Sequence, residues 1–193
     1  MPSQPSEQER LRALWDDESV QLCEQEWLAI LRQLLIFEPD DAGLWSALAF
    51  KLGYLLTDIS EQGGLALRSD PMFWEMISAF ERASELSPDD VAGPYNRAAA
   101  FKEAGLLEEA YPLYLQAGRL EVAHPGDIEW PAAWHFRHAA EVALELGRPD
   151  DARAALQEAV DLCGADDPDV LEVLGEFGAK AGYPGPHRTS AST

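Results

Sequence analysis

Basic side chains are scarce in this sequence of 193 residues, in which 14 Lys and Arg stand against 35 Asp and Glu, a formal net charge of −21. Phosphate polyanions repel a chain with this excess of negative charge, so ordinary binding to DNA or RNA is excluded. Anionic membrane surfaces are disfavoured for the same reason. The charge does not imply disorder, because 47% of the residues are apolar, enough for one domain with a sizeable core.

Long apolar runs are missing as well. The longest candidate, residues 28–37, is interrupted by Arg32 and Gln33 and falls short of the roughly 18 residues that span a bilayer. The first residues lack the basic and apolar regions of a signal peptide. We therefore expect a cytoplasmic protein that has no membrane partner.

Cysteine is rare, with only Cys23 and Cys163, which lie far apart and form no CxxC pair. Two free thiols in a reducing compartment are the favoured interpretation. A bridge between the two residues stays open at the level of sequence.

The signatures of several enzyme classes are absent: there is no glycine-rich phosphate loop, no HExxH and no GxSxG. His135, His138 and Glu141 are spaced so that neighbours on one helical face might be metal ligands. The i, i+6 spacing drifts around the helix, and His135 is expected to point away from any groove. We therefore predict no catalytic residues, no metal and no cofactor.

An internal repeat is present instead. A large apolar residue is followed three positions later by alanine, and the alanines Ala83 and Ala117 are 34 residues apart. Ala117 and Ala159 are 42 residues apart, which is one period plus eight. Pro39 and Pro88 are 49 residues apart, one period plus fifteen. A 34-residue unit with two insertions accounts for every interval.

This pattern resembles the tetratricopeptide repeat (TPR) family, whose unit is a 34-residue helix–turn–helix. Its small, aromatic and glycine positions recur in two units: Ala98, Phe101, Gly105, Ala110, Tyr114 and Ala117, then Ala140, Ala143, Gly147, Ala152, Leu156 and Ala159. The resemblance implies an all-α, right-handed superhelical solenoid of antiparallel helix pairs with about nine helices.

The residue types at several of these positions also have a physical reason. Alanines such as Ala110 and Ala152 allow two helix axes to approach to about 8–10 Å. Gly105 and Gly147 occur where a first helix should end in a left-handed cap. Pro112 lies about five residues into a predicted second helix, so that helix is expected to start late or to kink.

The repeat predicts the domain organisation. We expect a flexible N-terminus at 1–7, a TPR-like domain at 8–182 and a flexible tail at 183–193. Within the domain we expect a degenerate unit at 8–41, a unit at 42–90 with an inserted loop at 57–71, units at 91–124 and 133–166, and a terminal helix at 168–182. The loop at 57–71 is either a tolerated surface loop or a flap over a groove.

In proteins of this family the first helix of each pair lines a concave side, so the resemblance implies a groove for a partner peptide. Carrying the register over places these candidate partner-binding residues in it: Phe50, Tyr54, Tyr95, Asn96, Lys102, Trp134, Arg137 and His138. Asn96 would bond to a partner's backbone amide, and Arg137 would meet a carboxylate. Packing roles for Trp134 and Tyr54 are the alternative.

The resulting hypothesis is a non-catalytic adaptor or scaffold that binds a protein or peptide segment. Adaptors that grip chaperone C-termini are disfavoured, because Ser46 and Phe50 replace the Lys and Asn of their first unit. A self-associating protein is the first alternative, with a homodimer formed through the terminal helix or the edge near Trp15. A metal-binding protein and an acidic mimic of DNA are further alternatives, and the sequence does not identify the partner.

Overall fold

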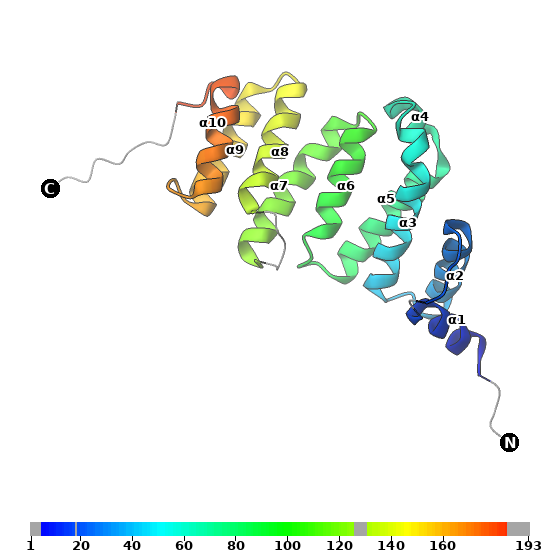
Figure 1. The fold of residues 1–193 in the computed structure, drawn as a ribbon. Coiled ribbons are helices and arrows are strands. Elements are labelled where there is room, and N and C mark those ends of the chain that lie inside the picture. Colours follow the sequence, from blue (N-terminus) through cyan, green and yellow to red (C-terminus); the bar gives the residue numbers. More distant parts are fainter. Residues whose placement is uncertain (1–4, 18, 126–130, 185–193) are drawn as a thin grey trace. The chain divides into compact units, whose positions relative to one another are not determined.

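The computed structural model describes residues 5–17, 19–125 and 131–184, and these form ten helices and no strand (Figure 1). The chain divides into two compact units, unit 1 at Met1–Pro88 and unit 2 at Asp89–Thr193. The boundary falls between the second and third predicted repeats. Each unit contains five complete helices, and each is described by itself.

Unit 1 contains α1 (Glu7–Asp16), α2 (Glu24–Phe37), α3 (Ala42–Ser60), α4 (Gly64–Ser69) and α5 (Pro71–Leu86). The central helix α3 packs against α2 and α5, while α1 contacts α2 and the short α4 lies against α3 and α5. The core side chains are at most 1% exposed and are Leu31, Leu34, Leu44, Ala49, Leu52, Phe73 and Ala79.

Unit 2 contains α6 (Ala92–Glu103), α7 (Leu107–Ala123), α8 (Ala132–Glu145), α9 (Pro149–Cys163) and α10 (Pro168–Ala181). Consecutive helices pack on one another, and α10 covers both α8 and α9 (Figure 1). This is the arrangement of two stacked hairpins closed by a single terminal helix.

Small residues allow these close crossings. Ala98, Ala110, Ala140 and Ala152 are all 0% exposed, as expected for contact points between helix axes. One close approach was not predicted from the sequence. A Cβ added at Gly118 of α7 would lie 2.8 Å from Cζ of Phe136 on α8, so the ring packs directly on the α7 backbone.

The turns inside the two hairpins of unit 2 are alike. Gly105 and Gly147 have φ of 72° and 71°, a region that glycine enters without strain. The N–H of Leu106 donates to the Phe101 carbonyl at 2.8 Å, and the N–H of Arg148 repeats this bond one hairpin later. The predicted left-handed caps are confirmed.

The inserted segment at 57–71 differs from the expected loop. Helix α3 continues to Ser60, α4 follows, and the Asp70 side chain caps α5 by accepting from the N–H of Met72. Leu67 is 2% exposed and anchors α4, whereas Leu65 is 69% exposed. Burial of one leucine turns the insertion into an additional short helix, which explains why ten helices are seen where about nine were predicted.

Helix α7 begins at Leu107, so of the two predicted alternatives the late start is wrong, and a kink at Pro112 stays a prediction. The proline lies inside the helix on its exposed side, while Ala110 and Tyr114 on the other side are buried. Packing of that buried side overrides the local cost of the missing N–H.

Order extends further at both ends than predicted. Ser6 caps α1 in a reciprocal capping box with Glu9. The Tyr183 hydroxyl donates to Oε1 of Gln157 at 2.8 Å, so the first residue of the predicted tail is attached to α9. The remainder of that tail, 185–193, and residues 1–4 lie outside the described residues. Across the described helices, none is both long and apolar enough to cross a bilayer.

Candidate partner-binding surface

The eight predicted partner-binding residues divide between the two units. Phe50 and Tyr54 are on α3 of unit 1, and the other six are on α6 and α8 of unit 2. In unit 2, Trp134, Arg137 and His138 have the spacing of one side of α8. We call this side, together with the side chains of α6 and α10 that contact it, the α8 face.

The opposite side of α8 faces the core. Its residues are at most 1% exposed and are Ala133, Phe136, Ala139, Ala140 and Ala143. Burial of four alanines and one large ring on that side orients the helix. The polar and aromatic side chains of the α8 face are consequently held at the surface of unit 2.

An aromatic cluster joins α6, α7 and α8. The Tyr95 ring centroid lies 5.2 Å from that of His135 and 6.0 Å from that of Tyr114. The His138 ring stacks on Tyr114 at 5.1 Å, and its side chain is 21% exposed. Most of the surface of His138, which was predicted as a binding residue, is therefore buried in packing contacts.

His135 is the unexpected member of this cluster. Sequence reasoning treated it as an ordinary helix residue, yet it is 2% exposed and neither ring nitrogen has a hydrogen-bond partner among the described residues. Burial, with a smaller contribution from His138, lowers its pKa to about 4. Burial also lowers the pKa of His138 and raises that of Tyr114. The cluster is thus uncharged at neutral pH.

Lys102 of α6 is already matched by carboxylates of α8. Its Nζ lies 2.6 Å from Oε2 of Glu141 and 3.7 Å from Oε1 of Glu145. Burial on its own would raise the pKa of Glu141, but the hydrogen bond and charge of Lys102 outweigh it and the pKa is lowered. Two carboxylates against one ammonium leave this part of the α8 face with a negative charge.

Arg137 is held between two aromatic rings. Its Cζ lies 5.9 Å from the ring centroid of Trp134 and 5.5 Å from that of Phe177 on α10. Its Nε is 3.4 Å from Oε2 of Glu176, and the side chain is 27% exposed. Cation–π contacts of this kind attract the guanidinium to the ring faces and so orient it. Asn96 is half-buried on α6.

The ion pairs of Lys102 and Arg137 share a spacing with a third pair, which sequence reasoning missed. Cations contact carboxylates one structural repeat further along: Lys102 with Glu141, Arg119 with Glu158 and Arg137 with Glu176, each 39 residues apart. Unit 1 has a similar pair, Arg32 with Glu75, 43 residues apart. These spacings equal none of the intervals of 34, 42 and 49 residues read from the sequence, so a search for opposite charges would have needed to allow a few residues on either side of the repeat.

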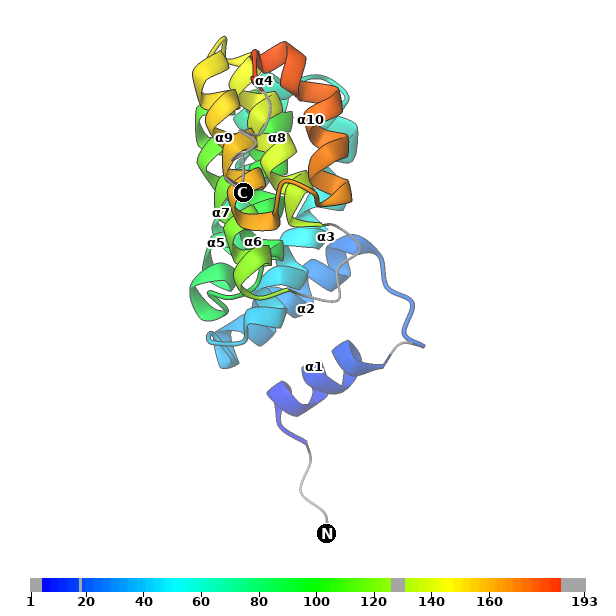
Figure 2. The same cartoon turned by 90° about the vertical axis from the view of Figure 1, so that its left-hand side faces the viewer.

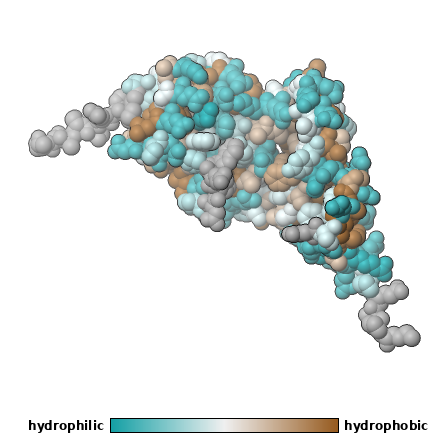
Figure 3. Space-filling view, viewed as in Figure 1, coloured by the Kyte–Doolittle hydropathy of each residue, from teal (hydrophilic) through white to brown (hydrophobic). Residues whose placement is uncertain are grey.

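Unit 1 presents its own candidate residues. The Phe50 side chain is 46% exposed and its ring packs edge-on against Phe80 at 5.3 Å. Tyr54 is 68% exposed, with Nζ of Lys51 5.9 Å from its ring centroid. Figure 3 shows apolar surface over α2 and over α4, surrounded by hydrophilic side chains. Tyr54 is therefore the most exposed of the eight predicted residues.

The positions of the metal-ligating and thiol side chains bear on two further kinds of chemistry. The described part of the chain contains no group of three or more His, Cys, Asp or Glu side chains placed to hold a metal ion. Cys23 is exposed and Cys163 is half-buried, and both thiols are free. This resolves the alternative of a bridge that the sequence left open.

Comparison with known proteins yields distant similarities. No family model matches the chain. Coatomer subunit beta'-1 of Oryza sativa subsp. japonica is 32% identical over 125 residues, which cover 58% of this chain and only 13% of the coatomer subunit.

Among solved structures, a MamA RS-1 ArsTM double mutant is 15% identical and superposes with a TM-score of 0.56, covering 94% of this chain and 89% of its own. A second MamA structure is 13% identical with a TM-score of 0.51, covering 91% and 83%. At this identity the likeness concerns the fold alone.

Proposed function

Since the chain has the tetratricopeptide-repeat fold, as the sequence pattern predicted, we propose that it is a non-catalytic scaffold that binds a segment of a partner protein. Proteins of this fold serve in general as protein-interaction modules. The relative named as a coatomer subunit is, by that name, one component of a larger assembly. Such a role needs a preformed surface and no reactive centre.

The α8 face carries the proposal, and the single most important observation is Arg137 held between Trp134 and Phe177. Arg and Trp are the residue types that most often anchor interfaces. Their orientation is fixed before any partner arrives, so little side-chain freedom is lost on binding. Tyr95 and His138 extend the same surface toward α6.

Charge indicates what kind of segment binds there. Lys102 faces both Glu141 and Glu145, and Glu176 already occupies the carboxylate position beside Arg137. We therefore no longer assign Arg137 a contact with a carboxylate of the partner, and propose that it stacks on the partner's side chains. The polar contacts with the partner are assigned to Glu141, Glu145 and Glu176. A segment rich in Lys or Arg fits this surface and is attracted to a chain of net charge −21.

A capture experiment with matched variants tests this assignment. The double variant Trp134→Ala/Arg137→Glu is compared with wild type and with Arg119→Glu, which breaks the equivalent Arg–Glu pair between α7 and α9. Far-UV circular dichroism first establishes that all three retain their helicity. We expect the double variant alone to lose bound partners, and the partner affinity of wild type to weaken as salt increases. Identical partner lists for all three proteins would reject the α8 face as the site.

A further inference from the structure

Helix α1 is attached to unit 1 more weakly than any neighbour. It is described throughout its length and has no buried residue, and Leu14 is 40% exposed. Residues 19–23, which precede α2, form no helix. Figure 2 shows α1 at the edge of unit 1, below α2. A helix that buries so little apolar surface gains little from the hydrophobic effect.

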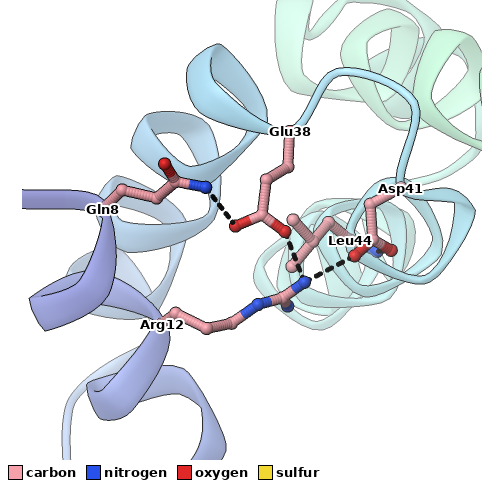
Figure 4. Close-up of polar contacts among 5 residues, drawn as sticks. All are labelled: Gln8, Arg12, Glu38, Asp41 and Leu44. Atoms are coloured by element: carbon pink, nitrogen blue, oxygen red, sulfur yellow. Dashed lines mark hydrogen bonds and ion pairs between the residues drawn. The ribbon is translucent and has the colours of Figure 1, made fainter.

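A charged contact holds the first part of α1 (Figure 4). Nη2 of Arg12 donates to Oε2 of Glu38 at 2.5 Å and to Oδ2 of Asp41 at 2.7 Å. Nε2 of Gln8 donates to Oε1 of Glu38 at 3.2 Å. Glu38 ends α2 and Asp41 caps α3 by accepting from the N–H of Leu44, so the corner between these two helices is acidic.

An aromatic contact holds the second part. The Trp15 ring lies edge-on against Trp27 of α2, with 5.6 Å between centroids. Arg12 and Trp15 are three residues apart and therefore lie on one side of α1. We call the surface formed by Trp27, Glu38 and Asp41 the α1 seat. It recognises a cation followed three residues later by an aromatic ring.

Glu38 of the seat also lines an open hollow of about 510 Å³ against α1, together with Ser6 and residues of α1 itself. Two carboxylates, Glu38 and Asp41, face the single guanidinium of Arg12, so the corner keeps a net negative charge while α1 is bound. An incoming cationic side chain is attracted to this corner before α1 leaves.

We propose that the α1 seat is a docking site for a partner helix that carries Arg or Lys three residues before an aromatic residue, and that α1 is the chain's own displaceable occupant. The chemistry of the partner is read from α1 itself, because Arg12 and Trp15 show which groups the seat accepts. This surface belongs to unit 1 and is independent of the function proposed for the α8 face of unit 2.

Because α1 is covalently attached to unit 1, it competes with any added helix for the α1 seat. A segment joined by a short linker competes at an effective concentration on the order of millimolar. A free helix therefore binds weakly to wild type and strongly to a variant whose own α1 has been released. Arg12→Glu/Trp15→Ala in the full chain removes both anchors of α1 and leaves the seat intact.

The probe is a fluorescein-labelled synthetic peptide of residues 5–17, followed by fluorescence anisotropy. We expect it to bind the released variant at least about tenfold more tightly than it binds wild type. Arg10→Glu is the matched control, since it makes the same charge change on α1 at a side chain that donates to the carbonyl of Pro5. This control should behave as wild type. Equal peptide affinity for the released variant and wild type, with helicity retained, overturns the proposal.

A charge exchange tests the seat itself. Glu38→Arg in the released variant should weaken peptide binding about tenfold or more, and a peptide with Arg12→Glu should restore it. Glu38 is chosen because the Asp41 side chain also caps α3. Peptide binding unaffected by Glu38→Arg contradicts the seat. A wild-type dimer in light scattering that Glu38→Arg abolishes assigns the seat to α1 of a second copy and overturns the partner proposal.

Discussion

Acidification should destabilise unit 2 through His135. The pKa of this residue is about 4 in the folded chain against 6.5 for an unperturbed histidine. Because the folded pKa is the lower one, the unfolded chain takes up the proton first. The stabilising contribution is fully present above about pH 6.5 and is lost as the pH falls toward 4.

The magnitude follows from the two pKa values. One pKa unit corresponds to about 1.4 kcal/mol, so the full effect is about 3 kcal/mol, and about 2 kcal/mol of it is lost between pH 7 and pH 5. Since His135 is almost fully buried, solvent does not screen this effect. Burial lowers the pKa of His138 as well, so His138 acts in the same direction.

The groups that face the histidine pair do not obscure the measurement. Tyr95 and Tyr114 have raised pKa values and stay neutral throughout this range. Glu141, beside His138 and Lys102, has a lowered pKa and stays ionised at pH 5. The interval from pH 5 to pH 7 therefore reports mainly on the two histidines.

Urea unfolding followed by far-UV circular dichroism at pH 5, 6 and 7 and constant ionic strength measures the effect. His135→Phe is the test variant, because a phenyl ring fits beside Tyr95 and no hydrogen bond of His135 is lost among the described residues. We expect this variant to match or exceed wild-type stability at pH 7 and to lose much less between pH 7 and pH 5. A wild type that loses under about 0.5 kcal/mol, or a variant with the full wild-type loss, refutes the reasoning.

Two further predictions concern packing in unit 2. Ala110 is 0% exposed at a helix crossing, so Ala110→Leu overfills it and should lower the free energy of unfolding by about 1–3 kcal/mol. The exposed Ala154→Leu should change the free energy of unfolding little. Equal urea midpoints for the two variants would show that the crossing is misplaced. Gly118→Ala places a methyl group 2.8 Å from Cζ of Phe136 and should destabilise by a similar amount, about 1–3 kcal/mol. Adding Phe136→Leu should recover part of that loss when both are measured by thermal unfolding, and no recovery would contradict the close contact.

Much of the fold was predictable because the constraints that set it are local and recur. Two antiparallel helices need small residues where their axes approach, and Ala98, Ala110, Ala140 and Ala152 occur at those points and are fully buried. The turn between them needs a residue with positive φ, and Gly105 and Gly147 provide it. Such requirements make the same residue types recur at corresponding positions of each repeat.

The candidate site was predictable only in outline. The register placed Tyr95, Trp134 and Arg137 on one face, but it did not indicate that Glu176 already accompanies Arg137 or that His138 stacks on Tyr114. These partners come from helices of neighbouring repeats. Their distances depend on how the repeats stack, which no single unit of sequence specifies.

By itself, the sequence determined the all-α repeat and the acidic character of the chain, because periodicity, composition and turn residues act over a few positions. Only the tertiary structure decided that 57–71 folds around Leu67, that His135 is buried without a partner, and that Arg12 joins α1 to the corner of α2 and α3. Each of these depends on the solvent exclusion and charge that side chains from distant segments create together, and those quantities exist only once the helices have packed.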